Sequence, residues 1–138
     1  MTPKDWERFD ARPILEVPAK PANGLWTLAR TRLPSPTLLR IAAEGRWTFL
    51  AGLEPCGPDG LQRWPFGQDQ LLCKKARPGA LLAKVSGSAS SIDDSDIYVI
   101  GAFAVLSLDQ ATGPLYFTIN DVPGFYDDNS GAVSVTIG

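Results

Sequence analysis

The sequence predicts an all-β protein, a small jelly-roll β-sandwich of two antiparallel sheets, and three observations support this prediction. Short runs rich in β-branched and aromatic residues recur along the chain, and turn residues close each run. The 13 glycines and 12 prolines among 138 residues are too many for a helical bundle. No segment has a helical periodicity of useful length. Many short strands at such spacing are typical of a sandwich or jelly roll.

The length and composition predict one domain over residues 1–138, with residues 1–11 as a polar lead-in. A chain of this size can bury a single hydrophobic core. Hydrophobic residues make up 44% of the chain and charged residues 20%, which is the balance of a folded globular protein.

We expect the strands to follow the apolar runs in order. The last run is the clearest, because Val133, Val135 and Ile137 fall on one face and the intervening residues on the other. A period of two with one apolar face indicates antiparallel strands that cover one core. The expected strands are residues 13–17, 25–31, 37–43, 46–50, 80–86, 97–100, 102–108, 115–120 and 132–137.

A long connection rich in glycine and proline, residues 51–78, separates two of these strands. Loops of this length in a small domain are either functional or packed by their own side chains. Trp26 and Trp47 lie in expected strands and are predicted to be core residues. Trp64 and Phe66 lie in the connection, where an aromatic side chain has less reason to be buried and could contact a ligand.

The absence of histidine excludes several kinds of chemistry. Neither a Ser-His-Asp or Cys-His catalytic site nor a zinc site with imidazole ligands can form. Cys56 and Cys73 are too few for structural zinc, and they are either a disulfide or two partly buried thiols. Asp127 and Asp128 are adjacent and point apart, unlike the paired carboxylates of a glycosidase. We therefore expect a protein that is not an enzyme.

The charge pattern argues against nucleic acid and membrane partners. All 13 Lys and Arg lie between Lys4 and Lys84 and are spread singly, whereas residues 85–138 carry seven Asp and no base. Among these, Asp93, Asp94 and Asp96 read as a solvated turn. No apolar run approaches the roughly 18 residues of a membrane span. Residues 1–10 are too polar for a signal peptide, which leaves both a cytoplasmic location and export without a cleaved signal open.

Residues 120–131, with the sequence Asn-Asp-Val-Pro-Gly-Phe-Tyr-Asp-Asp-Asn-Ser-Gly, concentrate oxygen ligands between the last two expected strands. A chain reversal at residues 122–124 can aim Asp121 at the same point as Asp128 and Asn129, and backbone carbonyls can complete a calcium shell of six to eight oxygens. The spacing is not that of an EF-hand. Composition alone also allows a loop in which Asp and Asn stabilise turns without any metal.

Residues 119–138 resemble the C-terminal signature of the PA-IL (LecA-type) family of bacterial galactose-specific lectins. The likeness is dense over Asn-Asp-Val-Pro-Gly, Asn-Ser-Gly and the alternating last strand, and extends more loosely back through residues 79–81 and Gly45. The resemblance implies a jelly-roll fold in which calcium bridges the loop and two adjacent sugar hydroxyls. It also implies galactose-containing glycans as ligands and assembly as a homo-oligomer.

Carried over by position, the resemblance implies one calcium ion held through the side chains of Asp121, Asp128 and Asn129. The backbone carbonyls of Phe49 and Phe125 are the remaining implied metal ligands. Asp121 and Asp128 would also contact the sugar.

The backbone N–H of Val122 is implied to reach a sugar hydroxyl. Two positions that face the exocyclic hydroxymethyl group depart from the family, because Phe66 and Asp69 stand where the family has His and Gln. Asp128 also replaces a more usual amide. These departures leave an alternative open, a structural or interaction domain in which calcium staples a loop and no sugar is bound.

Overall fold

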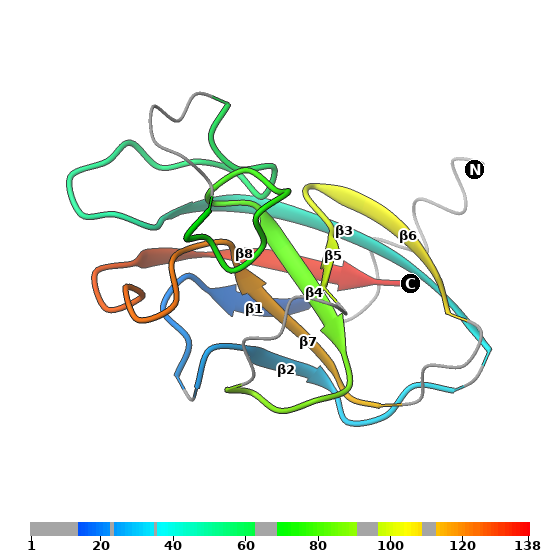
Figure 1. Ribbon diagram of the computed structural model, residues 1–138. Coiled ribbons are helices and arrows are strands. Elements are labelled where there is room, and N and C mark those ends of the chain that lie inside the picture. The colour runs from blue at the N-terminus through cyan, green and yellow to red at the C-terminus, as the bar shows by residue number, and fades with distance from the viewer. Residues whose placement is uncertain (1–13, 23, 35, 63–68, 91–96, 109–112) are drawn as a thin grey trace, which may run out of the picture.

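The structure is a computed structural model that describes residues 14–22, 24–34, 36–62, 69–90, 97–108 and 113–138 (Figure 1). Within these ranges the chain forms strands and no helix, so none of the described segments is a helix long and apolar enough to cross a membrane. The strands are β1 (Ile14–Pro18), β2 (Thr27–Arg30), β3 (Thr37–Thr48), β4 (Leu81–Val85), β5 (Ile97–Val99), β6 (Phe103–Leu108), β7 (Leu115–Ile119) and β8 (Ser130–Ile137).

The strands form two four-stranded sheets with the orders β1-β8-β3-β6 and β2-β7-β4-β5. Every pairing between these strands is antiparallel. The first strand pairs with the last, the second with the seventh, the third with the sixth and the fourth with the fifth. This nested pairing is the topology of a jelly roll, and it confirms the predicted fold class.

The expected strands 37–43 and 46–50 are wrong as separate elements, because they form the single long strand β3. Gly45 adopts a φ of 124° and stays in register opposite Val133 of β8. A Cβ on Gly45 would lie 2.9 Å from the carbonyl oxygen of Ala132. The glycine therefore allows close approach of the two strands rather than ending one of them. The other strands begin and end within one or two residues of their expected bounds.

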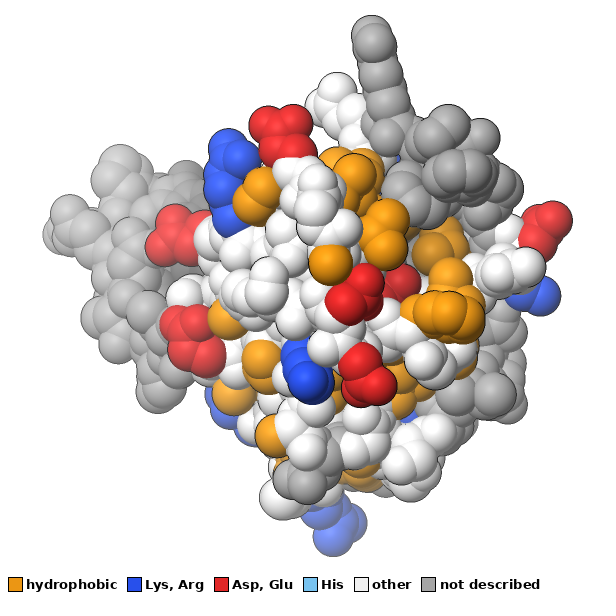
Figure 2. Space-filling view, turned by 90° about the vertical axis from the view of Figure 1, so that its left-hand side faces the viewer, with side chains coloured by type: hydrophobic (Ala, Val, Ile, Leu, Met, Phe, Trp, Pro, Cys, Tyr) orange, Lys and Arg blue, Asp and Glu red, His pale blue; other side chains and the backbone are white. Residues whose placement is uncertain are grey.

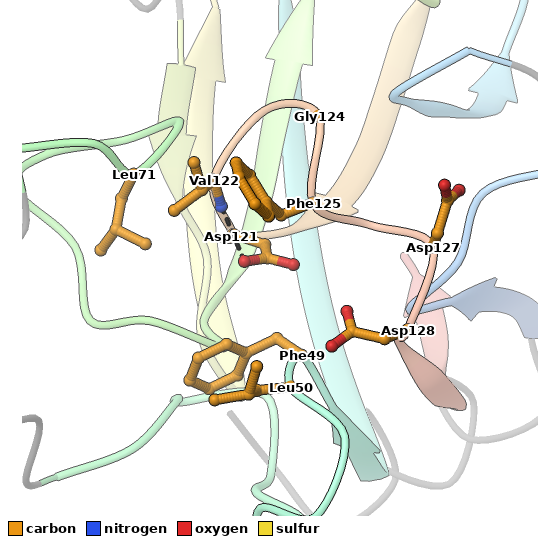
Figure 3. Close-up of a pocket in the computed structure, with 9 residues that line it drawn as sticks. All are labelled: Phe49, Leu50, Leu71, Asp121, Val122, Gly124, Phe125, Asp127 and Asp128. Carbon is orange, nitrogen blue, oxygen red and sulfur yellow. Dashed lines mark hydrogen bonds between the residues drawn. The ribbon is translucent and has the colours of Figure 1, made fainter.

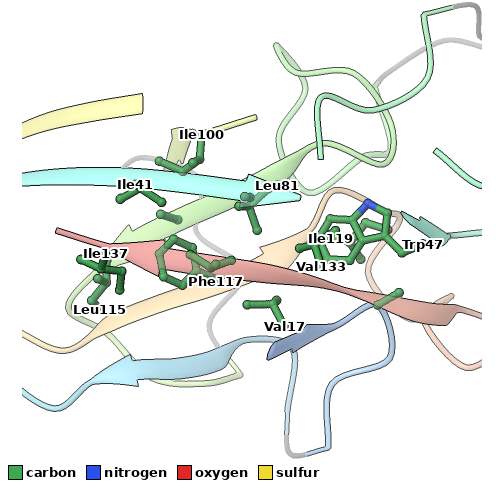
Figure 4. Packing of buried hydrophobic residues seen from close by; sticks show 14 of the residues in the cluster. Val17, Ile41, Trp47, Leu81, Ile100, Leu115, Phe117, Ile119, Val133 and Ile137 are labelled. Atoms are coloured by element: carbon green, nitrogen blue, oxygen red, sulfur yellow. The ribbon is translucent and has the colours of Figure 1, made fainter. Parts of the chain in front are cut away.

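The main core lies between the two sheets (Figure 4). Trp47 is only 1% exposed and donates a hydrogen bond of 2.8 Å from Nε1 to the carbonyl of Gly79, which confirms it as a core residue. Strand β8 contributes Val133, Val135 and Ile137 to this core and alternates with less buried residues, as its sequence predicts.

A second apolar cluster covers the outer face of the sheet β2-β7-β4-β5. Strands β4 and β7 are buried at every residue, so both faces of the sheet are covered at these two strands. The reason is the connection before β4, which packs Leu72, Cys73 and Ala76 against the outward side chains of this sheet. Trp26, predicted to be a core residue, is confirmed as buried in this second cluster.

Lys84 is buried inside the second cluster, with Nζ 4.8 Å from the ring centre of Trp26 and 5.1 Å from that of Tyr116. Its ammonium donates to the carbonyl of Ser88, and burial lowers its pKa. Cys56 and Cys73 are buried free thiols, so the thiol alternative is correct and the disulfide is absent.

Candidate functional site

The loop between β7 and β8 contains two consecutive turns. The carbonyl of Val122 accepts a hydrogen bond of 2.9 Å from the N–H of Phe125, with Pro123 and Gly124 in between. Gly124 has a φ of 93°, and proline followed by a glycine of positive φ is the signature of a type II turn. The second turn is closed by the N–H of Asn129, which donates to the carbonyl of Tyr126 at 3.2 Å. The chain therefore reverses where its sequence predicts.

Two buried side chains hold this loop in place. Asn120 accepts a hydrogen bond from the N–H of Cys73 and donates to the carbonyls of Cys73, Ala76 and Arg77. The hydroxyl of Tyr126 donates to the carbonyl of Ile119 at 2.7 Å. Asn120 therefore links the loop to the connection before β4 through hydrogen bonds.

Asp121 is 4% exposed and begins the loop. Its Oδ1 accepts a hydrogen bond of 2.7 Å from the N–H of Val122, whereas its buried Oδ2 accepts none from the described residues. Burial raises the pKa of Asp121 to about 6, and the charge of Asp128 adds to this effect. The N–H of Val122 and the nearby amide of Asn129 oppose the rise in pKa.

Asn129 and Asp128 face the same region. Asn129 donates from Nδ2 to the carbonyl of Ala19 at 2.9 Å, while its buried Oδ1 accepts no hydrogen bond from any described residue. Asp128 accepts a hydrogen bond of 3.1 Å at Oδ2 from the N–H of Ala51. In Figure 3 the carboxylate of Asp128 points toward Asp121 and that of Asp127 points away.

These side chains fit a hard cation. Buried acceptors without donors are rare in folded proteins and need an explanation. Here the two such oxygens, one each on Asp121 and Asn129, belong to side chains predicted as calcium ligands. Carboxylate and amide oxygens are ligands that calcium prefers. No cluster of three or more His, Cys, Asp or Glu occurs in the described ranges, so a cation here also needs the amide and backbone carbonyls.

A cavity of about 500 Å³ opens beside Asp121 and Asp128, at the end of the sandwich seen in Figure 2, and Asn129 does not line it. Acidic and apolar side chains lie next to each other near the centre of this face. Figure 3 shows Asp121 between two pairs of apolar side chains, one from its own loop and one from the end of β3. The lining residues are Phe49, Leu50, Leu71, Asp121, Val122, Gly124, Phe125, Asp127 and Asp128.

Most of the predicted site residues meet at this cavity. Phe49 and Phe125, predicted to bind metal through their carbonyls, both line it. The N–H of Val122, predicted for a sugar hydroxyl, donates instead to Asp121. Asp69 is exposed and does not line the cavity. Phe66 lies outside the described residues, as do Trp64, Asp93, Asp94 and Asp96.

Sequence reasoning did not assign four of the lining residues to the site. Gly124 and Asp127 belong to the loop that it singled out, whereas Leu50 and Leu71 come from other segments. Leu50 directly follows Phe49, so its position at the end of a strand was the available signal. Leu71 comes from the connection before β4, and nothing in its local sequence distinguishes it from the neighbouring Leu72, which faces the second cluster.

Comparison with known proteins supports the fold and identifies the family. The solved structure described as "EclA N-terminal domain; PllA-like lectin" is similar to this chain, with a TM-score of 0.63 and 23% sequence identity. The similarity covers 90% of this chain and 92% of that one, and it shows a shared fold. The family model described as "PA-IL-like protein" matches residues 36–138, which include the whole acidic loop and the strands on either side of it. The chain therefore belongs to the PA-IL-like protein family.

Proposed function

We propose that this protein is a calcium-dependent lectin that binds a galactose-type sugar at the acidic loop and does not transform it. The observation that carries the proposal is the pair of buried oxygens, Asp121 Oδ2 and Asn129 Oδ1, that accept no hydrogen bond from the described residues, together with the cavity that Asp121 lines. Membership of the PA-IL-like family and the shared fold with a PllA-like lectin support it.

Asp121, Asp128 and Asn129 would hold the ion through side-chain oxygens, and Phe49 and Phe125 would complete the shell through carbonyls. Bound calcium supplies a centre at which two adjacent sugar hydroxyls can replace water, because its coordination is flexible. The carboxylates of Asp121 and Asp128 then accept hydrogen bonds from those hydroxyls. Such charge-assisted bonds are roughly twice as strong as neutral ones.

The affinity of one site is expected to be weak, on the order of 10 µM to 1 mM, because a monosaccharide offers little apolar surface. Several sites on one assembly raise the effective affinity without new contacts. We therefore propose that the protein acts as a homo-oligomer. Light scattering coupled to gel filtration measures the number of copies, and a monomer at all concentrations contradicts this part of the proposal.

Calorimetric titration with galactose, in calcium and in chelator, tests the central proposal. We expect binding in calcium only, and loss of binding in the Asp121→Asn variant. Asp127→Asn is the matched control for the loss of one carboxylate, because Asp127 lies in the same loop and also lines the cavity, but its carboxylate points away from Asp121 (Figure 3). Binding of equal strength in chelator would overturn the role of calcium.

One observation favours the alternative, a structural domain in which calcium stabilises the loop and no sugar is bound. The N–H of Val122 already donates to Asp121 at 2.7 Å, so a sugar hydroxyl must compete for it. Calcium that raises the melting temperature, combined with no binding of any galactoside, would support this alternative against the lectin.

A further inference from the structure

We propose that a second cavity, separate from the acidic loop, binds an anionic saccharide, a sugar ring that carries a carboxylate, and that it does so without calcium. This second cavity has a volume of about 380 Å³ and shares no lining residue with the cavity beside Asp121. It lies where the connection before β4 meets the turn between β5 and β6 (Figure 1). The inference therefore adds a site to the proposed function and does not depend on it.

Two cations meet at the second cavity without a counterion. Lys75 and Arg77 both line it, and neither makes an ion pair with a described residue. Asp59 is the one acid among the described residues that line the cavity, so these charged side chains leave an excess of one positive charge. Like charges gathered around one hollow focus their field there and attract a ligand of opposite charge. We therefore expect the ligand to be an anion.

The segment that carries both cations is fixed through its backbone. Nδ2 of Asn120 donates hydrogen bonds to the carbonyl of Ala76 at 3.2 Å and to that of Arg77 at 3.1 Å. The N–H of Ala80 also donates to the carbonyl of Arg77 at 3.2 Å, and Ala80 forms a β-bridge with Asp59. The cavity is therefore formed before a ligand arrives, and binding has to order only the exposed side chains.

The carboxylate of Asp59 is also held in place, because its Oδ1 accepts a hydrogen bond of 2.8 Å from the N–H of Ala102. It lines the second cavity together with the side-chain amide of Gln62 and the buried apolar side chain of Ile100. A fixed acceptor, an amide and an apolar surface are the groups that a sugar ring uses, through its hydroxyls and its C–H bonds. A volume of about 380 Å³ is within the usual range of small-molecule sites.

These groups together specify the class of ligand. The carboxylate of a sugar acid would pair with Lys75 and Arg77, while its hydroxyls would donate to Asp59 and accept from Gln62. A simple carboxylate such as acetate would leave Asp59 and Gln62 without a partner, and a neutral sugar would leave both cations without one. A sugar acid satisfies all four side chains.

An NMR titration of the calcium-free protein with methyl β-glucuronide tests the second cavity. Calcium is removed with a chelator, and the chelator is then removed by dialysis, so the acidic loop holds no ion. We expect the amide signals of Gly60 and Gly101, which line the second cavity, to shift with ligand concentration. The amide signal of Gly124, in the acidic loop, should not shift.

Substitution of the two cations tests their role. Because both side chains are exposed, Lys75→Gln and Arg77→Gln should each weaken glucuronide binding about threefold, and the double variant about tenfold. Lys74→Gln is the matched control for the loss of one positive charge. Lys74 is the exposed neighbour of Lys75 but does not line the cavity, so this variant should keep the wild-type affinity.

Two further ligands define the specificity. Methyl β-glucoside, the neutral analogue, should bind about tenfold more weakly than the glucuronide, and equal binding would overturn the role of the cations. Acetate should also bind more weakly, and equal binding of acetate would overturn the assignment to a saccharide.

The remaining outcomes separate this inference from the proposed function. An affinity for glucuronide that survives the double substitution overturns the second site, and so do shifts at Gly124 in place of Gly60 and Gly101. Neither result affects galactose binding in calcium. Failure of galactose to bind in calcium overturns the proposed function and leaves the second site standing.

Discussion

Asn129 donates a hydrogen bond of 2.9 Å from Nδ2 to the carbonyl oxygen of Ala19, a residue 110 positions earlier. This contact fixes the orientation of the amide, because a carbonyl can only accept. Oδ1 must then point the other way, where it is buried and accepts no hydrogen bond from the described residues. Ala19, the residue after β1, thus orients Oδ1 of Asn129, one of the predicted calcium ligands.

Asn129→Ala should destabilise the protein even in chelator. Ala19 is fully buried, so its carbonyl would lose its partner in a place that water does not reach. An unpaired buried acceptor costs about 1–3 kcal/mol of unfolding free energy. Urea denaturation measures the loss. Ser130→Ala is the matched control at the exposed neighbouring position, where only a solvent-accessible hydrogen bond of 2.6 Å to the hydroxyl of Thr48 is removed and a smaller loss of about 0.5 kcal/mol is expected. Equal losses in the two variants would contradict the structural role of Asn129.

The stability of the metal-free protein should fall as the pH rises through the titration of Asp121. The pKa of Asp121 is raised from 3.8 to about 6, chiefly by burial, so the folded state binds this proton more tightly than the unfolded chain does. The unfolding free energy then decreases between about pH 4 and pH 6, by up to about 3 kcal/mol, and stays level above.

The difference in unfolding free energy between wild type and Asp121→Asn isolates the contribution of Asp121. The variant has no proton to lose at this position, so denaturation in chelator should show wild type losing stability relative to it across the window. A difference that does not change between pH 4 and pH 6 would show that Asp121 is solvated in the folded state.

Calcium should raise the melting temperature through Asp121. Calcium that binds only the folded state raises the unfolding free energy by about 2.7 kcal/mol when its concentration is a hundred times Kd. For a domain of this size, this corresponds to a rise in melting temperature of roughly 10 °C. The shift should be lost in Asp121→Asn, which removes the charge but keeps the shape, and retained in Asp127→Asn. Scanning calorimetry at neutral pH, where Asp121 is ionised, measures both shifts. A full shift in Asp121→Asn would remove this residue from the site.

The parts of the fold that sequence predicts well depend on local pattern. Alternation predicts the buried face of β8 because Val133 and Val135 repeat at every second position. The sequence of the loop predicts the chain reversal, because Pro123 and Gly124 favour a type II turn. For the same reason Asp121 and Asn129 could be placed together from sequence.

The parts that sequence does not predict depend on distant contacts. In the sequence, Gly45 separates the expected strands 37–43 and 46–50. Only its pairing with Val133 of β8 shows that the strand continues through it. Tyr116 lies on the face of β7 away from the main core, and the connection before β4 buries it there. The apolar wall of the cavity beside Asp121 comes from three segments, so Leu71 carries no local signal of its place in it, and the only signal for Leu50 is its position directly after Phe49.

Gly124, in the first turn of the acidic loop, and Gly131, in β8 just after the loop, should differ in their tolerance of a side chain. Gly124 has a φ of 93° and Gly131 a φ of 84°, and both are unfavourable for L-residues by about 1–2 kcal/mol. A Cβ at Gly124 would meet nothing within 4 Å, so strain is the whole expected loss in Gly124→Ala.

At Gly131 the Cβ would lie 2.7 Å from the carbonyl oxygen of Arg46 and 2.9 Å from Cα of Trp47. Both contacts are with the backbone of β3, which at Trp47 pairs with β8 on one side and with Cys56 on the other, so it cannot move away independently. Overpacking of this kind adds about 1–3 kcal/mol to the strain, so Gly131→Ala should be clearly the less stable variant in urea denaturation. Because Gly131 lies two residues after Asn129, its substitution should also weaken calcium binding, whereas Gly124→Ala should do so less. Equal losses of stability in the two variants would show that β8 shifts to relieve the contact, and would contradict the close pairing of Gly131 with Trp47.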